Sequence, residues 1–176
     1  VGAIGCLLFS GLCDMFDGMV ARPKKNRSEE EKKFGIQLDS LADVICFGAF
    51  PAMMGYALCK DSYFWLPSII VGVIYVLAAI IRLGYFNVTE EIRQKETKEK
   101  RKTYDGLPVT SAAILLPALF VAKGVLGQCF GLAYIIVLFM IALAFVLKIK
   151  VKKVGKVGSI VLVAIGILVF AILVSL

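Results

Sequence analysis

The stretch WLPSIIVGVIYVLAAIIRLGYF, residues 65–86, contains a single charged side chain, that of Arg82. A helix crosses the hydrocarbon core of a bilayer with about 20 mostly apolar residues, so this stretch is long enough to span it. Five more stretches of similar character lie at 1–22, 35–59, 108–126, 129–147 and 157–176. Hydrophobic residues make up 60% of the 176-residue chain, against about 45–50% in soluble domains. The sequence therefore predicts an all-α, polytopic membrane protein with about six transmembrane helices.

Lysine and arginine are distributed unevenly over the connections between these six stretches. Connections 23–34, 87–107 and 148–156 hold five, six and five of them, whereas the two remaining connections hold only Lys60 and Lys123. Because positive residues accumulate on the cytoplasmic side of membrane proteins, we expect the three basic connections to be cytoplasmic. The net charge of +7 is then a topology signal that also suits contact with anionic lipids, and nucleic-acid binding has no further support. We expect a multi-pass protein of the cell membrane.

Histidine is absent from the chain, which excludes His-based triads and zinc sites with histidine ligands. Acid–base chemistry must therefore use carboxylates, lysine, tyrosine or cysteine. The five cysteines occur singly, without a CxxC pair, and are predicted to be small buried hydrophobic side chains.

Four aspartates lie near the ends of the first two predicted spans, both on the expected cytoplasmic side. Asp14 and Asp17 are three positions apart and Asp39 and Asp43 four apart, so each pair shares one helix face. Carboxylates that face one another near a bilayer cannot all stay ionised without cations. Mg²⁺ or Mn²⁺ suits oxygen ligands, and four carboxylates suit two ions about 3.5–4 Å apart, an arrangement that clamps a phosphoryl group. We expect a two-metal active site at the cytoplasmic face.

Two other interpretations of the aspartates remain open at this point. They could cap helices or pair with loop lysines, although Asp14 and Asp17 lie near a helix C-terminus, where the helix dipole disfavours them. They could also line a proton or cation pathway. The spans at 108–126, 129–147 and 157–176 are almost free of charged residues, which favours chemistry at one membrane surface over a path across the bilayer.

The aspartates belong to a longer motif in two parts, separated by twelve residues. The first part is DxxDGxxAR, from Asp14 to Arg22, and the second is GxxxDxxxD, from Gly35 to Asp43. This pattern resembles the signature of the CDP-alcohol phosphotransferase family, although the segment between the two parts is longer than is usual there. Within that family the chain resembles the phosphatidylserine synthases most. The stretches that carry this resemblance are FGIQLDSLAD (34–43), FG (47–48), PA (51–52), RLGYFN (82–87) and GLP (106–108).

The resemblance covers about residues 1–120, the family core, and is silent on the last two predicted helices. The length of the chain predicts a single membrane domain over 1–176, in which 129–176 adds membrane helices. The resemblance also implies a homodimer and an additional helix upstream of Val1, where the chain opens inside an apolar run. The implied reaction transfers the phosphatidyl group of CDP-diacylglycerol to the hydroxyl of L-serine, releases CMP and forms phosphatidylserine.

The resemblance also assigns roles to the motif residues. The metal ligands would be Asp14, Asp17, Asp39 and Asp43, and Asp43 would also be the catalytic base that takes the proton of the attacking hydroxyl. The residues that border the CDP-lipid would be Gly18, Ala21, Arg22 and Gly35. Small residues at three of these positions would let a nucleotide or pyrophosphate approach the backbone closely.

Serine, the expected acceptor, brings a carboxylate that needs a cationic partner. Arg82 lies near the cytoplasmic end of an otherwise apolar span, where an arginine is expensive unless it has a partner or reaches the interface. We therefore expect Arg82 to bind the acceptor carboxylate, with Asn87 nearby; snorkelling to lipid phosphates or pairing with an aspartate is the alternative. Inositol, inositol phosphate or glycerol phosphate are alternative acceptors, and an ion-coupled transporter is the alternative from another functional class.

Overall fold

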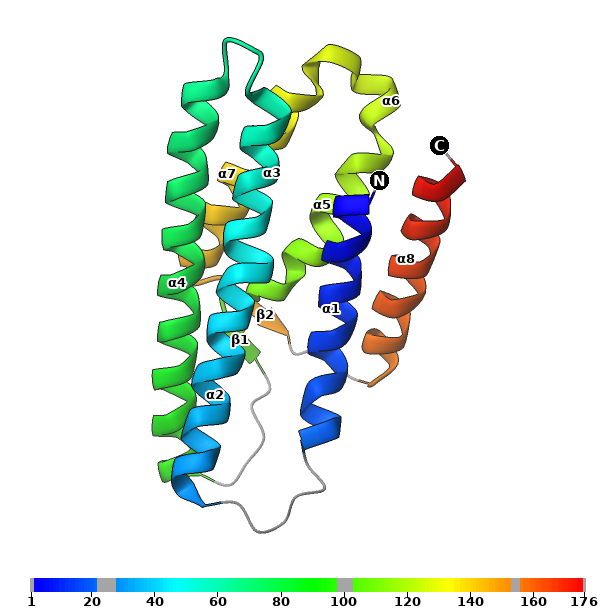
Figure 1. The fold of residues 1–176 in the computed structure, drawn as a ribbon. Helices are drawn as coiled ribbons and strands as arrows, with labels where there is room; N and C mark the ends of the chain where they lie inside the picture. The colour runs from blue at the N-terminus through cyan, green and yellow to red at the C-terminus, as the bar shows by residue number, and fades with distance from the viewer. Residues whose placement is uncertain (1, 22–27, 98–102, 153–155, 176) are drawn as a thin grey trace.

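The computed structural model describes residues 2–21, 28–97, 103–152 and 156–175, and within these ranges the chain is almost entirely helical (Figure 1). The elements in chain order are α1 (Gly2–Ala21), α2 (Glu29–Asp43), the π-helix η1 (Val44–Ala49), α3 (Phe50–Cys59), α4 (Trp65–Glu96), β1 (Thr103–Asp105), the 3₁₀-helix η2 (Val109–Ser111), α5 (Ala112–Val121), α6 (Lys123–Leu126), the 3₁₀-helix η3 (Gly127–Cys129), α7 (Phe130–Val146), β2 (Lys150–Lys152) and α8 (Lys156–Ser175). The predicted helical class is confirmed. The sequence did not predict the short antiparallel pair of β1 and β2, in which Tyr104 is opposite Val151.

Three helical rods in the described part of the chain are long and apolar enough to cross a membrane. They are Glu29–Cys59, which joins α2, η1 and α3 without a break, Trp65–Glu96, and Lys123–Val146. The remaining apolar helices are shorter, at Gly2–Phe16, Val109–Val121 and Val163–Leu173. Each of the six predicted spans thus contains a helix, but that all six cross the bilayer remains a prediction.

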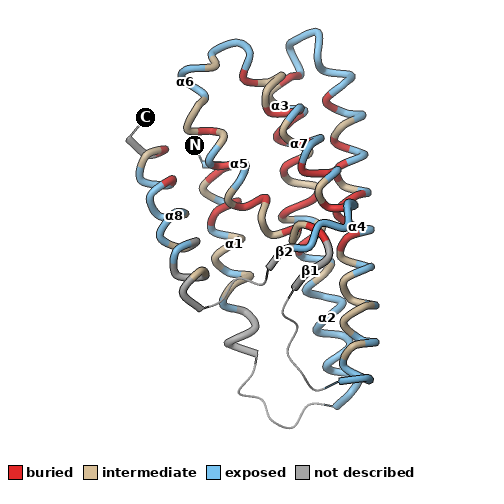
Figure 2. Tube along the Cα trace, turned by 180° about the vertical axis from the view of Figure 1, so that it is seen from behind, coloured by how far each residue is buried: buried red, intermediate tan, exposed pale blue. Residues whose placement is uncertain are grey.

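The helices form a bundle in which α4 packs against both α3 and α7, while α5 packs against both α1 and α8 (Figure 1). The core consists of tightly buried aromatic and aliphatic side chains, with Tyr75, Tyr134, Phe47 and Phe145 the largest. Figure 2 shows that burial is concentrated in the middle and upper part of the bundle, away from the free lower ends of α2 and α4. The cysteines were predicted to be buried, and this was wrong for Cys6, Cys13 and Cys129, which are exposed.

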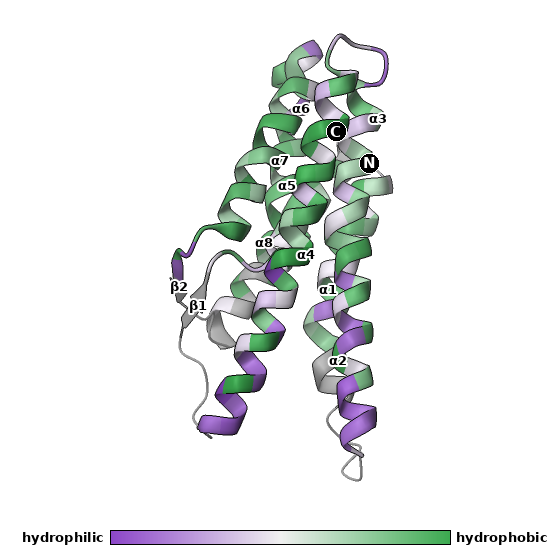
Figure 3. Cartoon of the chain, turned by 90° about the vertical axis from the view of Figure 1, so that its left-hand side faces the viewer, coloured by the Kyte–Doolittle hydropathy of each residue, from purple (hydrophilic) through white to green (hydrophobic). Residues whose placement is uncertain are grey.

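Two predicted boundaries were wrong, because polar helical turns extend beyond the apolar stretches. Residues 23–34 were expected to be a loop, but α2 begins at Glu29, where Ser28 and Glu31 form a reciprocal capping box with bonds of 3.1 and 3.2 Å. The span expected at 65–86 continues to Glu96, where Arg93 pairs with Glu90 at 2.6 Å along the helix. Figure 3 shows these two extensions as the hydrophilic ends of α2 and α4, which lie at the same end of the bundle.

Candidate metal centre

Three carboxylates from two helices come close together in the structure. Asp14 comes from α1, and Asp39 and Asp43 lie one turn apart on α2. One carboxylate oxygen from each lies within 4.8 Å of the other two. Their exposure decreases along this series from Asp39, which is exposed, through Asp14 to Asp43, which retains 9% of its surface. The structure therefore brings together three of the four aspartates that the sequence singled out.

The remaining residues of the first motif part are only partly described. The positions of Asp17, Gly18 and Ala21 belong to the helical backbone of α1, but their side chains lie outside the described part of the structure. Arg22 lies outside the described residues altogether. The roles expected of these four residues remain predictions.

Gly35 lies on α2, one helical turn before Asp39, and it faces open space. A side-chain carbon placed on it would meet no heavy atom within 4 Å. Its backbone is therefore accessible to a bound group that approaches the helix on that side. This geometry suits the expected contact with a nucleotide, which remains a prediction.

The donor set at the centre suits a hard divalent cation. Carboxylate oxygens are the ligands that Mg²⁺ and Mn²⁺ prefer, and a cation would offset the mutual repulsion of three carboxylates at this distance. The burial of Asp43 strengthens the case, because a carboxylate removed from water gains most from a nearby positive charge. These residues fit a divalent metal, and the identity and number of the ions are left to the proposal below.

Arg82 is 5% exposed and its guanidinium donates to two backbone carbonyls. Nε donates to the Leu107 carbonyl at 3.0 Å and Nη2 to the Gly106 carbonyl at 2.9 Å. The backbone N–H groups of the same two residues donate to Ile149 and Ala144. Arg82 thus connects α4 to the segment between β1 and η2, and the Leu107 N–H of that segment connects it to the end of α7. These two bonds go to backbone carbonyls, and the expected contact of Arg82 with the acceptor carboxylate remains a prediction.

Asn87 lies one to two turns beyond Arg82 on α4 and reaches the helix that carries two of the aspartates. Its side-chain amide donates to the Ser40 hydroxyl at 2.7 Å. Ser40 directly follows Asp39 in α2, so this bond joins the polar end of α4 to the metal-centre helix. The structure therefore places Asn87 beside the centre, while its contact with an acceptor remains a prediction.

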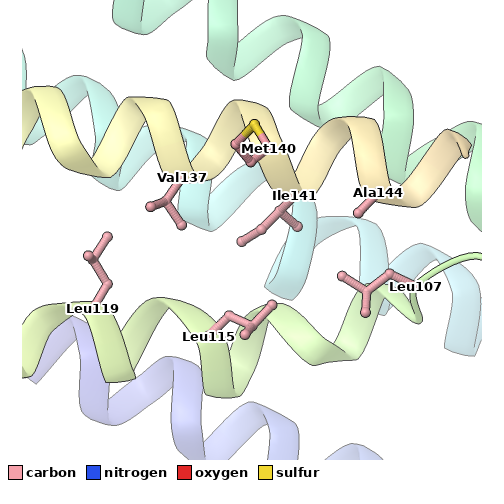
Figure 4. A pocket seen from close by; sticks show the side chains of 7 residues that line it. All are labelled: Leu107, Leu115, Leu119, Val137, Met140, Ile141 and Ala144. Atoms are coloured by element: carbon pink, nitrogen blue, oxygen red, sulfur yellow. The ribbon is translucent and has the colours of Figure 1, made fainter. Parts of the chain in front are cut away.

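An apolar groove lies apart from the carboxylates, between α5 and α7 (Figure 4). It is lined by seven apolar side chains, those of Leu107, Leu115, Leu119, Val137, Met140, Ile141 and Ala144. None of these seven lining side chains is polar.

Sequence reasoning missed two hydrogen-bonding residues in or near the helix that carries Asp39 and Asp43. Tyr75 was treated as part of a plain apolar span, but its hydroxyl donates to the Phe47 carbonyl at 2.8 Å. Ser40 was noted only as part of the family pattern. A signal for Tyr75 was available, since a phenol inside a spanning helix needs an acceptor and Pro51 deprives a neighbouring turn of a donor.

Comparison with known proteins gives a consistent result. A family model described as CDP-alcohol phosphatidyltransferase matches residues 1–146. The CDP-diacylglycerol–serine O-phosphatidyltransferase of Saccharomyces cerevisiae is 37% identical over 120 residues, which cover 66% of this chain and 41% of that protein. The archaetidylserine synthase of Methanothermobacter thermautotrophicus is 36% identical over 65% of this chain and 44% of its own length.

A shorter bacterial relative matches over more of its length. The CDP-diacylglycerol–serine O-phosphatidyltransferase of Bacillus subtilis is 32% identical over 137 residues, which cover 74% of this chain and 68% of that protein. The chain thus spans less than half the length of the first two relatives and about two thirds of the third.

Proposed function

Because the chain belongs to the CDP-alcohol phosphatidyltransferase family, we propose that it transfers the phosphatidyl group of CDP-diacylglycerol to the hydroxyl of L-serine, with release of CMP and formation of phosphatidylserine. The relatives from Saccharomyces cerevisiae and Bacillus subtilis, named for this reaction with serine, support the choice of acceptor. The family model covers residues 1–146, a range that contains the four aspartates and the three long helical rods.

One observation carries the proposal, namely the meeting of Asp14, Asp39 and Asp43 within 4.8 Å at the polar end of the bundle. CDP-diacylglycerol combines apolar chains with a charged pyrophosphate, so its reaction site must lie where hydrocarbon gives way to water. The aspartates lie at that level, because α2 is charged from Glu29 to Lys33 and the rod becomes apolar after Asp43. A transport path would require polar groups farther along the bundle.

We assign the metal ligands to Asp14, Asp17, Asp39 and Asp43, and the ions to two Mg²⁺ or Mn²⁺. When bound, such ions supply positive charge to the pyrophosphate and to the departing CMP. The chain itself shapes the nucleotide site through Gly18, Ala21, Arg22 and Gly35. Of these, Gly35 is supported by the open space beside it.

Asp43 is the residue we assign to proton transfer. As the serine hydroxyl oxygen bonds to the phosphorus of the phosphatidyl group, its proton passes to the Asp43 carboxylate, and the bond from that phosphorus to the CMP oxygen breaks. Asp43 suits this role because it is the most buried carboxylate of the three, and Asp14 and Asp39 lie beside it as further oxygen ligands for the cations.

Acceptor binding is assigned to the polar part of α4, which carries Arg82 and Asn87. Asn87 is supported by its bond to Ser40, next to Asp39. We further propose that the polar end of the bundle faces the cytoplasm, since the helix ends that adjoin the basic connections 23–34 and 87–107 lie there (Figure 1), and that two copies of the chain associate in the membrane.

The test is CMP release by the purified chain in lipid nanodiscs that contain CDP-diacylglycerol. Serine, inositol and glycerol 3-phosphate are supplied in separate reactions, with EDTA and then with Mg²⁺ or Mn²⁺ restored. We expect release that requires serine and is lost with EDTA. Release with inositol or glycerol 3-phosphate in place of serine would overturn the acceptor, whereas serine-dependent release that ignores EDTA would overturn the metal centre.

A further inference from the structure

The helix that carries Asp39 and Asp43 changes its hydrogen-bond pattern directly after Asp43. From Val44 to Ala49 the turn is π-helical, and the Phe50 N–H donates to the Ile45 carbonyl five residues back. A π-turn accommodates an additional residue, and such turns are frequent at functional sites. In an α-helix one residue corresponds to a rotation of about 100°. The π-turn therefore fixes the direction in which Asp39 and Asp43 point relative to α3.

A carbonyl inside this turn has lost its ordinary partner. In an α-helix the Phe47 carbonyl would accept from residue 51, but residue 51 is proline and has no N–H. The Tyr75 hydroxyl of α4 donates to this carbonyl at 2.8 Å. Phe47 is 1% and Tyr75 0% exposed, so water does not replace this donor. A buried carbonyl without a partner destabilises the conformation that contains it.

Close packing holds Tyr75 at the distance this bond requires. Gly72 and Ala79 lie on the same face of α4, about one turn to either side of it. A side-chain carbon on Gly72 would lie 3.3 Å from the Ala52 Cβ, and one on Gly48 would lie 3.6 Å from the Ala79 Cβ. The Tyr75 ring also packs against Phe145 of α7, with 5.5 Å between ring centroids. Larger residues at these glycines would separate the helices and lengthen the bond.

We propose that Tyr75 is a positioning residue for the carboxylate centre: its hydroxyl stabilises the π-turn at Phe47 and thereby directs Asp39 and Asp43 toward Asp14. This inference rests on the metal site of the proposed function. Tyr75 acts through Phe47 and the turn. Without the hydroxyl, the buried Phe47 carbonyl lacks this donor and the turn is no longer held in one geometry, so both α2 carboxylates lose their fixed direction toward the one on α1.

The chain supplies a matched control in Tyr134. Its hydroxyl also donates to a backbone carbonyl of the same helical rod, that of Pro51, at 3.1 Å, and Tyr134 is likewise 0% exposed. The Pro51 carbonyl lies after the π-turn, where the N–H of Gly55 follows at the α-helical spacing. Phenylalanine at either position removes one hydroxyl and keeps the ring.

The experiment is a Mn²⁺ titration of the detergent-solubilised chain, with free Mn²⁺ followed by electron paramagnetic resonance. We expect Tyr75→Phe to weaken Mn²⁺ binding about tenfold to a hundredfold, the range for residues that orient metal ligands, and Tyr134→Phe to bind as the unsubstituted chain does. In turnover assays Tyr75→Phe should lower kcat and leave the serine KM unchanged. Equal Mn²⁺ affinity in Tyr75→Phe and the unsubstituted chain, or equal weakening in both variants, would overturn the inference. A failure of the unsubstituted chain to bind Mn²⁺ would instead overturn the proposed metal site.

A second measurement uses the unsubstituted chain and does not depend on the folding of any variant. If the turn directs the carboxylates, metal binding must stabilise the turn in return, because the coupling of two equilibria is reciprocal. Mn²⁺ should therefore slow amide hydrogen exchange over Val44–Phe50 more than over residues 53–59 of the same rod. Slowing that is equal in both segments, or absent from Val44–Phe50, would show that metal binding and the π-turn are not coupled, and the positioning role of Tyr75 requires that coupling.

Discussion

The helices α1 to α4 and the helices α5 to α8 differ in what they bury. Among the residues whose side chains are described, the buried polar or charged ones are Asp43, Ser68 and Arg82, all on α2 or α4. The described buried residues of α5, α7 and α8 are apolar or aromatic. Among the described residues, the first group of helices therefore contains the buried polar and charged side chains of the helices, and the buried side chains of the second group are apolar or aromatic.

This difference between the two groups of helices follows from the free-energy cost of burying a polar group in an apolar interior. A buried polar atom needs a hydrogen-bond partner, and within the described residues no buried side-chain nitrogen or oxygen lacks one. Among the described hydrogen bonds, one from Tyr134 to the Pro51 carbonyl links α7 to α3, and one from Arg82 to the Leu107 carbonyl links α4 to the segment before η2. If this comparison holds, substitutions in the first group should alter the chemistry, and those in the second should alter stability alone.

The largest effect is expected for Asp43→Asn. It removes the proposed base and one proposed metal ligand, and loss of a general base alone lowers turnover by about 10²–10⁴-fold. The measurement is serine-dependent CMP release in nanodiscs. Asp61→Asn is the control, because Asp61 lies in the connection before α4 with its side chain 89% exposed. Equal activity of the two variants would show that the buried carboxylate of Asp43 has no role in the reaction, contrary to the proposed difference between the two groups of helices.

Arg82 tests whether a buried charge in the first group is structural or chemical. Arg82→Ala leaves the Gly106 and Leu107 carbonyls without these donors, and we expect a loss of about 1–3 kcal/mol in the free energy of unfolding. Thermal unfolding in detergent reports this loss, and the serine KM reports any contact with the acceptor. Arg82→Lys keeps the charge, but its ammonium group does not reproduce the planar geometry in which the guanidinium donates to both carbonyls.

Gly106→Ala separates the two roles of Arg82. Gly106 has φ +96°, and a side-chain carbon there would lie 3.0 Å from the Leu147 carbonyl oxygen and 3.4 Å from the Arg82 Cζ, so this substitution strains the same segment while the positive charge is kept. A purely structural Arg82 predicts that both variants lower Tm and that neither raises the serine KM. A rise in KM for Arg82→Ala and Arg82→Lys, absent from Gly106→Ala, would assign Arg82 to the acceptor.

The sequence was sufficient to predict a helix wherever a long apolar stretch forms it. The span expected at 129–147 appears as α7 at Phe130–Val146. The boundaries failed at Glu29 and Glu96, because capping and salt bridges along the helix, which hydropathy does not register, continue these helices into water. The strands β1 and β2 depend on pairing between segments distant in sequence, and a three-residue strand carries no periodicity of its own.

The candidate site could be predicted as a set of residues but not as a set of contacts. The spacing of Asp39 and Asp43 on one helix face, together with the basic connections, was enough to predict that they meet Asp14. The π-turn was not predictable from periodicity, since it depends on Pro51 and on a hydroxyl donated by another helix. The backbone partners of Arg82 likewise lie 24 and 25 positions away in sequence, beyond any local pattern.

A smaller effect is expected at the bond between Asn87 and Ser40, which joins the two polar helix ends at 2.7 Å. Asn87→Ala and Ser40→Ala should each reduce stability by about 0.5–1.5 kcal/mol, the usual contribution of one hydrogen bond. Because the two side chains share that bond, the double variant should lose less than the sum of the single losses. The measurements are Tm and the serine KM of the two single variants and of the double variant. Strictly additive losses would show that the bond does not join these helix ends in the membrane.

The smallest effect on chemistry is expected from Leu138→Ala in α7, although its effect on stability is large. Leu138 is 0% exposed and lies beside Gly55 of α3, so alanine leaves a cavity whose formation costs about 2–5 kcal/mol of stability. Below its lowered Tm, the folded variant should keep the kcat and the Mn²⁺ affinity of the unsubstituted chain, because no polar contact of the centre passes through Leu138. A reduced Mn²⁺ affinity at full folding would mean that α7 fixes the carboxylates through α3. The second group of helices would then affect metal binding directly, in addition to stabilising the fold.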